Sequence, residues 1–260
     1  MLIGKPGPAK SALCTASASH VEIRGRDLCD ALMGRMSFTD YFFFLVTGGD
    51  ATDDQRFFLD TLLIAIAEHG LTPTAQAARM TYAADPQSLQ GAVAAGILGC
   101  GTVILGASEH CGQVLTAAMT RIEAGEDADA VVADIAQQTR TAGGRMPGFG
   151  HPLHRPVDPR TRRVLELVRE KGIGSRHLDI ALKLEAAVEE AWGRPLVMNV
   201  SMPIAAVLLD LEFPAAMIKA IPILARTAGL LAHLAEEQQR PIGFLMASHG
   251  EDAISYDGGA

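Results

Sequence analysis

The segment Pro147-Gly148-Phe149-Gly150-His151, followed by Asp158-Pro159-Arg160, is the most informative part of this 260-residue sequence. Asp158 is a favourable N-cap and Pro159 suits the first helical position, which predicts a helix that begins here with Arg160 in its first turn. Backbone N–H groups at a helix N-terminus favour an anion. Glycines on both sides of Phe149 allow a sharp turn, and His151 is then free to act as an acid or a base. The segment predicts half of a carboxylate-binding site, although a glycine loop with an incidental histidine is the alternative interpretation.

Charge is distributed unevenly along the chain. The net charge of −8 argues against general binding of nucleic acid or of anionic membranes, because both need a positive field. Between residues 140 and 163, however, a single acid, Asp158, accompanies six arginines: Arg140, Arg145, Arg155, Arg160, Arg162 and Arg163. Positive charge concentrated around His151 in an acidic protein predicts an anionic small molecule as the ligand. A solvated basic helix face is the alternative for Arg162 and Arg163.

Other features of the composition indicate the class of protein. The four cysteines show none of the spacings typical of a metal site, so we expect free thiols and no metal. The N-terminus lacks the layout of a secretory signal peptide, which makes a cytoplasmic protein the expectation. An uncharged, glycine-rich stretch over residues 91–107 is slightly short for a bilayer span and favours a buried core helix over a membrane segment.

Hydrophobic periodicity is helical over most of the chain, and the fold class that it predicts is all-α. One apolar stripe runs from Leu59 to Ile66 and continues at His69 before Gly70 and Pro73 end the helix, so His69 is expected to point inward at a helix C-terminus. A hydrogen-bonded core histidine is the alternative for this residue. Further helices are predicted over residues 27–34, 38–47, 88–105, 113–123, 127–140, 159–171, 176–191, 202–210 and 215–237.

Several motifs are informative in combination. Two motifs lie near the N-terminus: His20-Val21-Glu22-Ile23-Arg24-Gly25-Arg26-Asp27-Leu28 and Met36-Ser37-Phe38-Thr39-Asp40. The segment over residues 148–160 follows them downstream. In this order the motifs resemble those of the citrate synthase superfamily. Ala67-Glu68-His69-Gly70 and the tail over residues 237–256 resemble its citryl-CoA lyase branch, which includes the lyase module of ATP-citrate lyase. The resemblance extends from residue 20 onward.

The resemblance implies an overall organisation. It implies a citrate synthase-like, all-α homodimer in which a large lobe, residues 1–112 and 198–260, makes the dimer contacts. A small lobe, residues 113–197, would carry the Gly148-Phe149-Gly150-His151 loop and the basic residues that face CoA. The implied ligands are a CoA thioester and an oxo acid. Because the sequence has no nucleotide-phosphate loop, a separate CoA ligase would have to supply citryl-CoA.

The resemblance also implies roles for individual residues. His69 would bind oxaloacetate, His110 would hold the thioester enolate oxygen, and His151 would lie on the carbonyl or hydroxyl of the substrate. Arg160 and Arg226 match arginines that bind the oxaloacetate carboxylates, and guanidinium groups suit a dicarboxylate because they bind it with two hydrogen bonds each. Arg240 resembles an arginine that reaches across from the partner subunit. The residues expected at CoA are Gly148, Phe149, Gly150, Arg145 and Arg155, with Arg162 and Arg163 as further candidates for its phosphates.

One position departs from the superfamily pattern. The superfamily has its catalytic aspartate as the third residue of an Asn-Val-Asp motif, whereas this chain reads Asn199-Val200-Ser201. A serine hydroxyl is a poor base at neutral pH, which puts synthesis from acetyl-CoA in doubt. Cleavage is less affected, because it begins with the hydroxyl proton, for which His151 could be the base. The enolate could then be protonated through water relayed by Ser201 or by a carboxylate such as Glu109.

Three hypotheses follow for the function. The first is a carbon–carbon lyase of the citryl-CoA type that releases an oxaloacetate-like oxo acid and acetyl-CoA or a related acyl-CoA, with His110, His151 and Ser201 in the catalytic site. The second is condensation in the synthase direction. The third, motivated by the missing aspartate, is a catalytically impaired subunit that binds CoA or a dicarboxylate.

Overall fold

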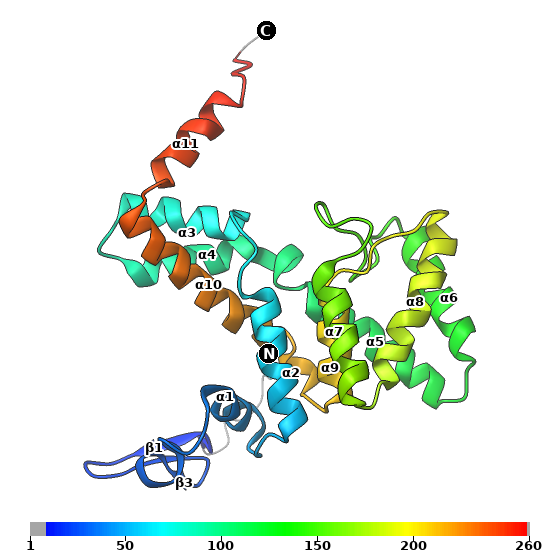
Figure 1. The fold of residues 1–260 in the computed structure, drawn as a ribbon, viewed down its shortest axis with the longest axis horizontal. Helices are drawn as coiled ribbons and strands as arrows, with labels where there is room; N and C mark the ends of the chain where they lie inside the picture. The colour runs from blue at the N-terminus through cyan, green and yellow to red at the C-terminus, as the bar shows by residue number, and fades with distance from the viewer. Residues whose placement is uncertain (1–8, 259–260) are drawn as a thin grey trace. The chain divides into compact units, whose positions relative to one another are not determined.

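The computed structural model describes residues 9–258, which form two compact units, residues 9–59 and residues 60–258 (Figure 1). The first unit contains a three-stranded antiparallel sheet in the order β1 (Cys14–Ala16), β2 (Val21–Ile23) and β3 (Arg26–Asp27). Arg24 and Gly25 connect β2 to β3 with positive φ angles of 46° and 81°. Such a two-residue turn matches the twist of a tight hairpin.

The helical part of the first unit follows the sheet. A short π-helical turn, η1 (Leu28–Leu32), takes the place of the helix predicted over residues 27–34, and α1 (Phe38–Thr47) has the predicted bounds. Ser37 caps α1 by accepting the N–H of Asp40, and Gly48 ends it in the left-handed region at φ 84°. Ile23, Leu32 and Phe44 form the core of this unit.

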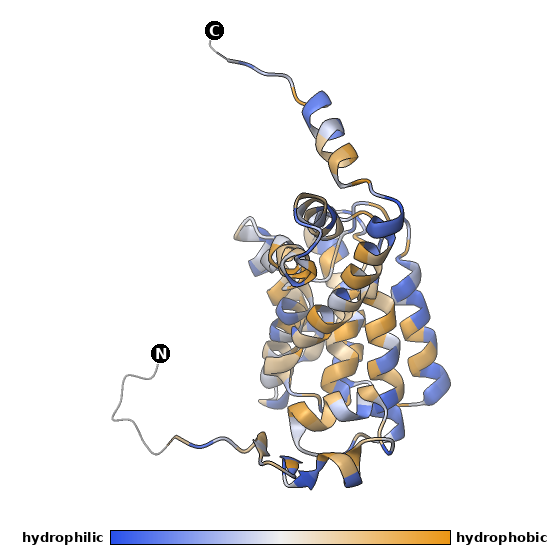
Figure 2. Cartoon of the chain, turned by 90° about the vertical axis from the view of Figure 1, so that its left-hand side faces the viewer, coloured by the Kyte–Doolittle hydropathy of each residue, from blue (hydrophilic) through white to orange (hydrophobic). Residues whose placement is uncertain are grey.

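The second unit is helical, which confirms the predicted fold class. Helix α2 (Asp53–Ala67) begins in the first unit and ends in the second. The elements after it are α3 (Pro73–Ala84), α4 (Leu89–Ile104), α5 (Ala107–Glu123), α6 (Ala128–Thr141), α7 (Pro159–Lys171), α8 (Arg176–Trp192), α9 (Ser201–Asp210), the 3₁₀ turn η2 (Ala215–Met217), α10 (Ala220–Gln239) and α11 (Gly243–Asp252). Figure 2 shows apolar and polar residues alternating along these helices, as expected for helices that bury one face.

Packing divides these helices into two neighbouring groups. Helices α3, α4 and α10 pack together with α11 against α3, and α5, α6, α8 and α9 form the second group (Figure 1). Close approach depends on glycine where α10 passes the end of α2. A Cβ on Gly229 would lie 2.0 Å from the carbonyl oxygen of Ala67, so a larger residue there would push the two helices apart. This crossing brings α10 beside the segment that holds His69.

Several helix boundaries differ from the predicted ones. Helix α2 ends at Ala67, so His69 lies just beyond the helix, and Pro73 begins α3 because proline is favoured in the first turn. Neither α3 nor α11 was predicted. Helix α5 begins at Ala107 and not at residue 113, which makes His110 helical. Helix α4, which lies between α3 and α5 in the chain, contains a kink at Gly101, whose φ of 52° and ψ of −167° are not helical.

Two segments, Leu89–Glu123 and Ala215–Gln239, have the length and apolar composition that a membrane span requires, and helices of a protein core meet the same criterion. On α4, Ala92 and Cys100 are buried, but the side chains of Leu98 and Val103 are 80% and 87% exposed. The stretch over residues 91–107 is therefore not the single buried core helix that the sequence predicts, because it is kinked at Gly101, leaves α4 at Ile104 and buries one face only.

Candidate active site

The predicted loop lies against α5 and α9, and glycine is needed for this contact. Gly148 and Gly150 have φ angles of 79° and 87°. A Cβ on Gly148 would meet the Cβ of Met202 at 2.8 Å and the Sγ of Cys111 at 2.9 Å. The N–H of Asn199 donates to the carbonyl of Gly148 at 2.8 Å, which ties the loop to the segment before α9. A side chain at residue 148 would therefore displace the loop from its support.

Asp158 orients Arg160 at the start of α7. Its carboxylate is fully buried and accepts the backbone N–H of Arg160 at 3.0 Å, its Nε at 3.0 Å and its Nη2 at 2.8 Å. It also accepts the N–H of Val200 at 3.2 Å. Burial opposes ionisation of Asp158, but the hydrogen bonds and charge of Arg160 outweigh it and lower the pKa of this carboxyl below its ordinary value. The predicted N-cap is confirmed, and it also fixes the direction of the arginine side chain.

Three histidines meet beside this loop. The ring centroids of His69 and His151 lie 5.6 Å apart, and His154 lies 5.1 Å from His69 and stacks on His151 at 4.4 Å. The Nε2 atoms of His69 and His154 are 2.9 Å apart, which is hydrogen-bond distance. Sequence reasoning did not select His154, although a second histidine in the same loop was a visible signal.

The hydrogen bonds of His151 determine where its proton lies. Its Nδ1 accepts the backbone N–H groups of Leu153 at 3.1 Å and of His154 at 2.9 Å. Nδ1 therefore carries no proton, and Nε2 carries it in the neutral ring. The Nε2 atom lies 3.5 Å from Nη2 of Arg160, so two hydrogen-bond donors face the same place. An anionic or carbonyl oxygen placed between them would satisfy both.

Arg226, on α10, is a second unsatisfied donor. Its side chain is 5% exposed, and among residues 9–258 its Nη1 is buried with no hydrogen-bond partner. A buried guanidinium without a partner is costly, because its charge has lost water and gained no counter-ion. Its charge also acts on His69, which places it near the histidines. Arg226 is therefore suited to an anionic ligand.

The surroundings lower the pKa values of His69 and His151. Burial is the largest cause that lowers the pKa of His69, followed by the charges of Arg160, His154 and Arg226. The pKa of His151 is lowered by burial first and then by His154 and Arg160. Both rings are therefore neutral at pH 7, so the positive charge of the site belongs to the arginines.

A hydrogen-bond network holds His69 in place. Oε1 of Glu68 accepts the N–H groups of His69 at 2.8 Å and Gly70 at 2.6 Å, and it lies 3.0 Å from Nε2 of His233. Nδ1 of His233 lies 3.1 Å from Nη1 of Arg79, so the arginine donates to the ring and the ring donates to Glu68. Arg79 is in turn paired with the buried Glu237 at 2.6 Å. The turn after α2 is therefore attached to α3 and α10.

Ser201 is linked to the loop through Asn199. It is the first residue of α9, its side chain is largely buried, and its N–H donates to Oδ1 of Asn199 at 3.1 Å. Nδ2 of Asn199 donates to the carbonyl of Gly150 at 3.0 Å. The residue that replaces the expected aspartate is thus coupled through Asn199 to the loop that carries His151.

The remaining predicted residues have other neighbours. His110 is in the first turns of α5, next to Cys111, and Glu109 is paired with Lys219 at 3.0 Å. Arg240 follows the end of α10, about 20 Å along the helix from Arg226. The exposed Arg162 and Arg163 pair with glutamates of their own helix, and no side-chain partner within residues 9–258 is recorded for the exposed Arg145 and Arg155. Their roles stay predictions.

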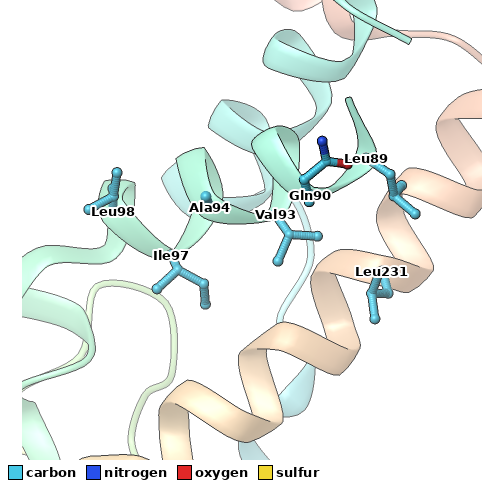
Figure 3. Close-up of a pocket in the computed structure, with 7 residues that line it drawn as sticks. All are labelled: Leu89, Gln90, Val93, Ala94, Ile97, Leu98 and Leu231. Atoms are coloured by element: carbon cyan, nitrogen blue, oxygen red, sulfur yellow. The ribbon is translucent and has the colours of Figure 1, made fainter. Parts of the chain in front are cut away.

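An apolar groove lies elsewhere in the second unit. Figure 3 shows its lining on α4 and α10, and its volume is about 660 Å³. The lining residues are Leu89, Gln90, Val93, Ala94, Ile97, Leu98 and Leu231. None of the histidines or arginines described above contributes to it, so the groove does not belong to the anion site.

The lowered histidine pKa values predict a pH dependence of stability. Below the ordinary histidine pKa of 6.5 the unfolded chain takes up protons that folded His69 and His151 resist, so the free energy of unfolding should fall as the pH falls from 7 towards 5. Urea unfolding at pH 7 and pH 5 measures this loss. In a His69→Gln/His151→Gln variant the loss should be smaller, and an identical loss in both proteins would contradict the pKa assignment.

Comparison with known proteins identifies the family. The model of the family "Citrate synthase, C-terminal domain" matches residues 9–243. A Mycobacterium tuberculosis protein whose name assigns it to the citrate synthases is 31% identical over 189 residues, which are 70% of this chain and 47% of that protein. The chain thus spans about half the length of the curated relatives it matches.

Solved structures share the fold. Citryl-CoA lyase from Hydrogenobacter thermophilus superposes with a TM-score of 0.84 at 26% identity, covering 98% of this chain and 96% of the other. ATP citrate lyase from Methanothrix soehngenii, solved with citrate and coenzyme A, has a TM-score of 0.78 at 20% identity and covers 99% of this chain and 43% of the other. The family match over most of the chain, together with the histidine and arginine site, shows that this protein belongs to the citrate synthase family.

Proposed function

We propose that this chain is a carbon–carbon lyase of the citryl-CoA type, which cleaves a β-hydroxyacyl-CoA to an oxaloacetate-like oxo acid and acetyl-CoA or a related acyl-CoA. The proposal depends on two observations: donors of His151 and Arg160 face one point, and the buried Nη1 of Arg226, whose charge acts on His69, has no hydrogen-bond partner within residues 9–258. The 96% coverage of citryl-CoA lyase from Hydrogenobacter thermophilus supports the direction of the reaction.

In the proposed reaction the two arginines bind carboxylates of the substrate. Arg160 is already oriented by Asp158, so little conformational entropy is lost when its free edge meets a carboxylate. Nε2–H of His151 donates to the oxygen on the carbon that becomes the keto carbon. This hydrogen bond strengthens as the oxygen gains charge, which is the differential stabilisation that lowers a barrier.

The bonds change in a simple order. A base of the site takes the hydroxyl proton of the substrate, the O–H electron pair forms the C=O bond of the oxo acid, and the C–C pair moves to the thioester as an enolate. We assign His110 to the enolate oxygen. The enolate carbon then takes a proton from water, and Ser201 is the side chain that we expect to position this water. Glu109 is less suited to this step because it is paired with Lys219.

Incubation with citryl-CoA tests the proposal. We expect equal amounts of oxaloacetate, measured through NADH oxidation by malate dehydrogenase, and of acetyl-CoA, measured by chromatography. His151→Ala should reduce the turnover by about 100-fold or more, the range typical of a lost hydrogen-bond donor to a developing charge, and should leave the circular dichroism spectrum unchanged. If the protein cleaves neither citryl-CoA nor its analogues, the proposal is wrong.

Condensation in the synthase direction is the second candidate function. The serine at residue 201, in place of an aspartate, is the observation that favours cleavage over condensation. We expect Ser201→Asp to increase the exchange of acetyl-CoA methyl protons with deuterated water, in the presence of oxaloacetate, by about 100-fold. The physical reason is that a carboxylate at this position supplies the missing base. Mass spectrometry of acetyl-CoA measures the exchange, with Ser201→Asn as the uncharged control. Rapid exchange by the wild-type protein would favour condensation instead.

The Ser201→Asp variant also tests the hypothesis that the chain is a catalytically impaired subunit. If the wild-type protein binds oxaloacetate in a calorimeter but turns over no thioester, and if Ser201→Asp creates activity, the chain is an impaired binding subunit. If Ser201→Asp lowers an activity that the wild-type protein already has, Ser201 is adapted to its own substrate and the impaired-subunit hypothesis fails.

We also propose partners for the chain. CoA would be bound by the loop over residues 148–150 together with Arg145 and Arg155, and a separate CoA ligase would supply the thioester. A homodimer would bring Arg240 of a second copy to the site, since Arg240 lies far along α10 from Arg226 in its own chain. We also propose the division into two lobes. The large lobe would comprise residues 1–112 and 198–260, and the small lobe residues 113–197.

A further inference from the structure

His154 is the one member of the histidine cluster without an expected role, and its contacts are specific. Its Nε2 lies 2.9 Å from Nε2 of His69, its ring stacks on His151, and its backbone N–H donates to Nδ1 of His151. This residue is therefore connected to both other rings of the site.

His151 is poorly placed to take the hydroxyl proton of the substrate. Its Nδ1 is engaged by two backbone N–H groups, so Nε2, the nitrogen that faces Arg160, already carries the proton. To accept another proton the ring would have to become a cation beside the guanidinium of Arg160. This differs from the base that the sequence suggested, and it makes His151 a donor of a hydrogen bond.

The His69–His154 pair has a free acceptor in either of its neutral arrangements. When one ring donates from Nε2 to the other, the donating ring has its proton on Nε2 and so has a lone pair on Nδ1. Among residues 9–258 no hydrogen bond to Nδ1 of His69 or of His154 is recorded. The pair thus always presents one unprotonated Nδ1 and one Nδ1–H.

We propose that the pair of His69 and His154 is the base of the lyase reaction, with His69 facing the substrate and His154 relaying the proton to solvent. This inference rests on the proposed function. The proton leaves the hydroxyl oxygen and binds Nδ1 of His69, the bridging proton passes from Nε2 of His69 to Nε2 of His154, and Nδ1–H of His154 releases its proton to water. The O–H electron pair becomes the C=O bond, so charge and atoms balance.

The electrostatics of the site couple this base to the substrate. Arg160 and Arg226 both lower the pKa of His69, and substrate carboxylates seated on these arginines would offset their charges. The pair would then accept a proton more readily with substrate bound than without it. The same two arginines disfavour a metal ion at the three histidines, because a dication would sit beside two guanidinium groups.

Kinetics of His154 variants test the relay. His154→Gln keeps a polar side chain that cannot take up and pass on a proton at neutral pH, so we expect kcat for citryl-CoA cleavage to fall by about 100-fold while the dissociation constant for oxaloacetate changes less than about threefold. Added imidazole should restore much of kcat to His154→Ala. His249→Gln, a change at an exposed histidine of α11, should leave both quantities unchanged.

Three results would overturn the inference. The first is a kcat of His154→Gln within threefold of wild type. The second is an equal loss of oxaloacetate binding without rescue by imidazole, which is the outcome of a merely structural role. The third is a tightly bound zinc ion, found by elemental analysis of the purified protein, whose removal abolishes cleavage.

Nitrogen-15 spectra of labelled histidine side chains separate this inference from the proposed function. They should show His151 protonated at Nε2 and one unprotonated Nδ1 in the pair, whether or not citryl-CoA is cleaved. A His151 protonated at Nδ1 would refute the relay. Correct tautomers in a protein that binds oxaloacetate but never cleaves the thioester would refute the lyase function on which the relay rests, whereas incorrect tautomers in a protein that cleaves citryl-CoA would refute the relay alone.

Discussion

Replacement of Arg226 by methionine is expected to weaken oxaloacetate binding by about 100-fold, or about 3 kcal/mol, without loss of stability. Arg226 is 5% exposed, and its Nη1 has no hydrogen-bond partner within the described residues. A ligand carboxylate would supply that partner, so the variant loses a buried charge-assisted pair. Titration calorimetry with oxaloacetate measures the change.

The stability of this variant distinguishes a binding residue from a structural one. Methionine is similar in length and apolar, so it removes an unpaired buried charge from the ligand-free protein. The free energy of unfolding in urea should therefore stay equal or rise, as is common where a site is built for binding and not for stability. Unchanged oxaloacetate affinity, or a variant that unfolds at lower urea, would contradict the role of Arg226.

Replacement of Arg79 by methionine should have the opposite effect and lower the free energy of unfolding by about 3–5 kcal/mol. The side chains of Arg79 and Glu237 are 2% and 1% exposed, and their contact is 2.6 Å. Without the arginine, the carboxylate of Glu237 would stay buried without its counter-ion, although it still accepts the N–H groups of Ile242 and Gly243. Urea unfolding of the two proteins measures the difference.

A matched control is available on α7. Arg163 is ion-paired with Glu166 and Glu170, but its side chain is 55% exposed. Arg163→Met should therefore change the free energy of unfolding by at most about 1 kcal/mol. Equal effects of the two substitutions would mean that the network around Arg79 does not support the turn that carries His69.

Local signals predicted the local structure of two segments of the candidate site. Asp158 and Pro159 identified the start of α7, and this alone located Arg160 correctly. The glycines around Phe149 indicated a close backbone approach, and Gly148 does lie against Met202 and Cys111. These features depend on residues within a few positions of one another, which is why sequence reasoning could find them.

Other parts of the site depend on contacts that no local pattern records. The partner of His69 is His154, 85 residues away in the chain, and the pairing of Arg79 with Glu237 spans 158 residues. The tautomer of His151 follows from backbone N–H groups whose direction is set by the loop conformation. Helix α3 was missed because Pro73 was interpreted as the end of one helix, whereas it begins the next.

The most direct test of the account is a crystal structure with oxaloacetate and a non-cleavable acetyl-CoA analogue. We predict that the oxaloacetate carboxylates lie on Arg160 and Arg226, that its keto oxygen accepts from Nε2 of His151, and that the thioester mimic approaches Ser201. Oxaloacetate bound away from both arginines, or a keto oxygen out of reach of His151, would contradict the central claim.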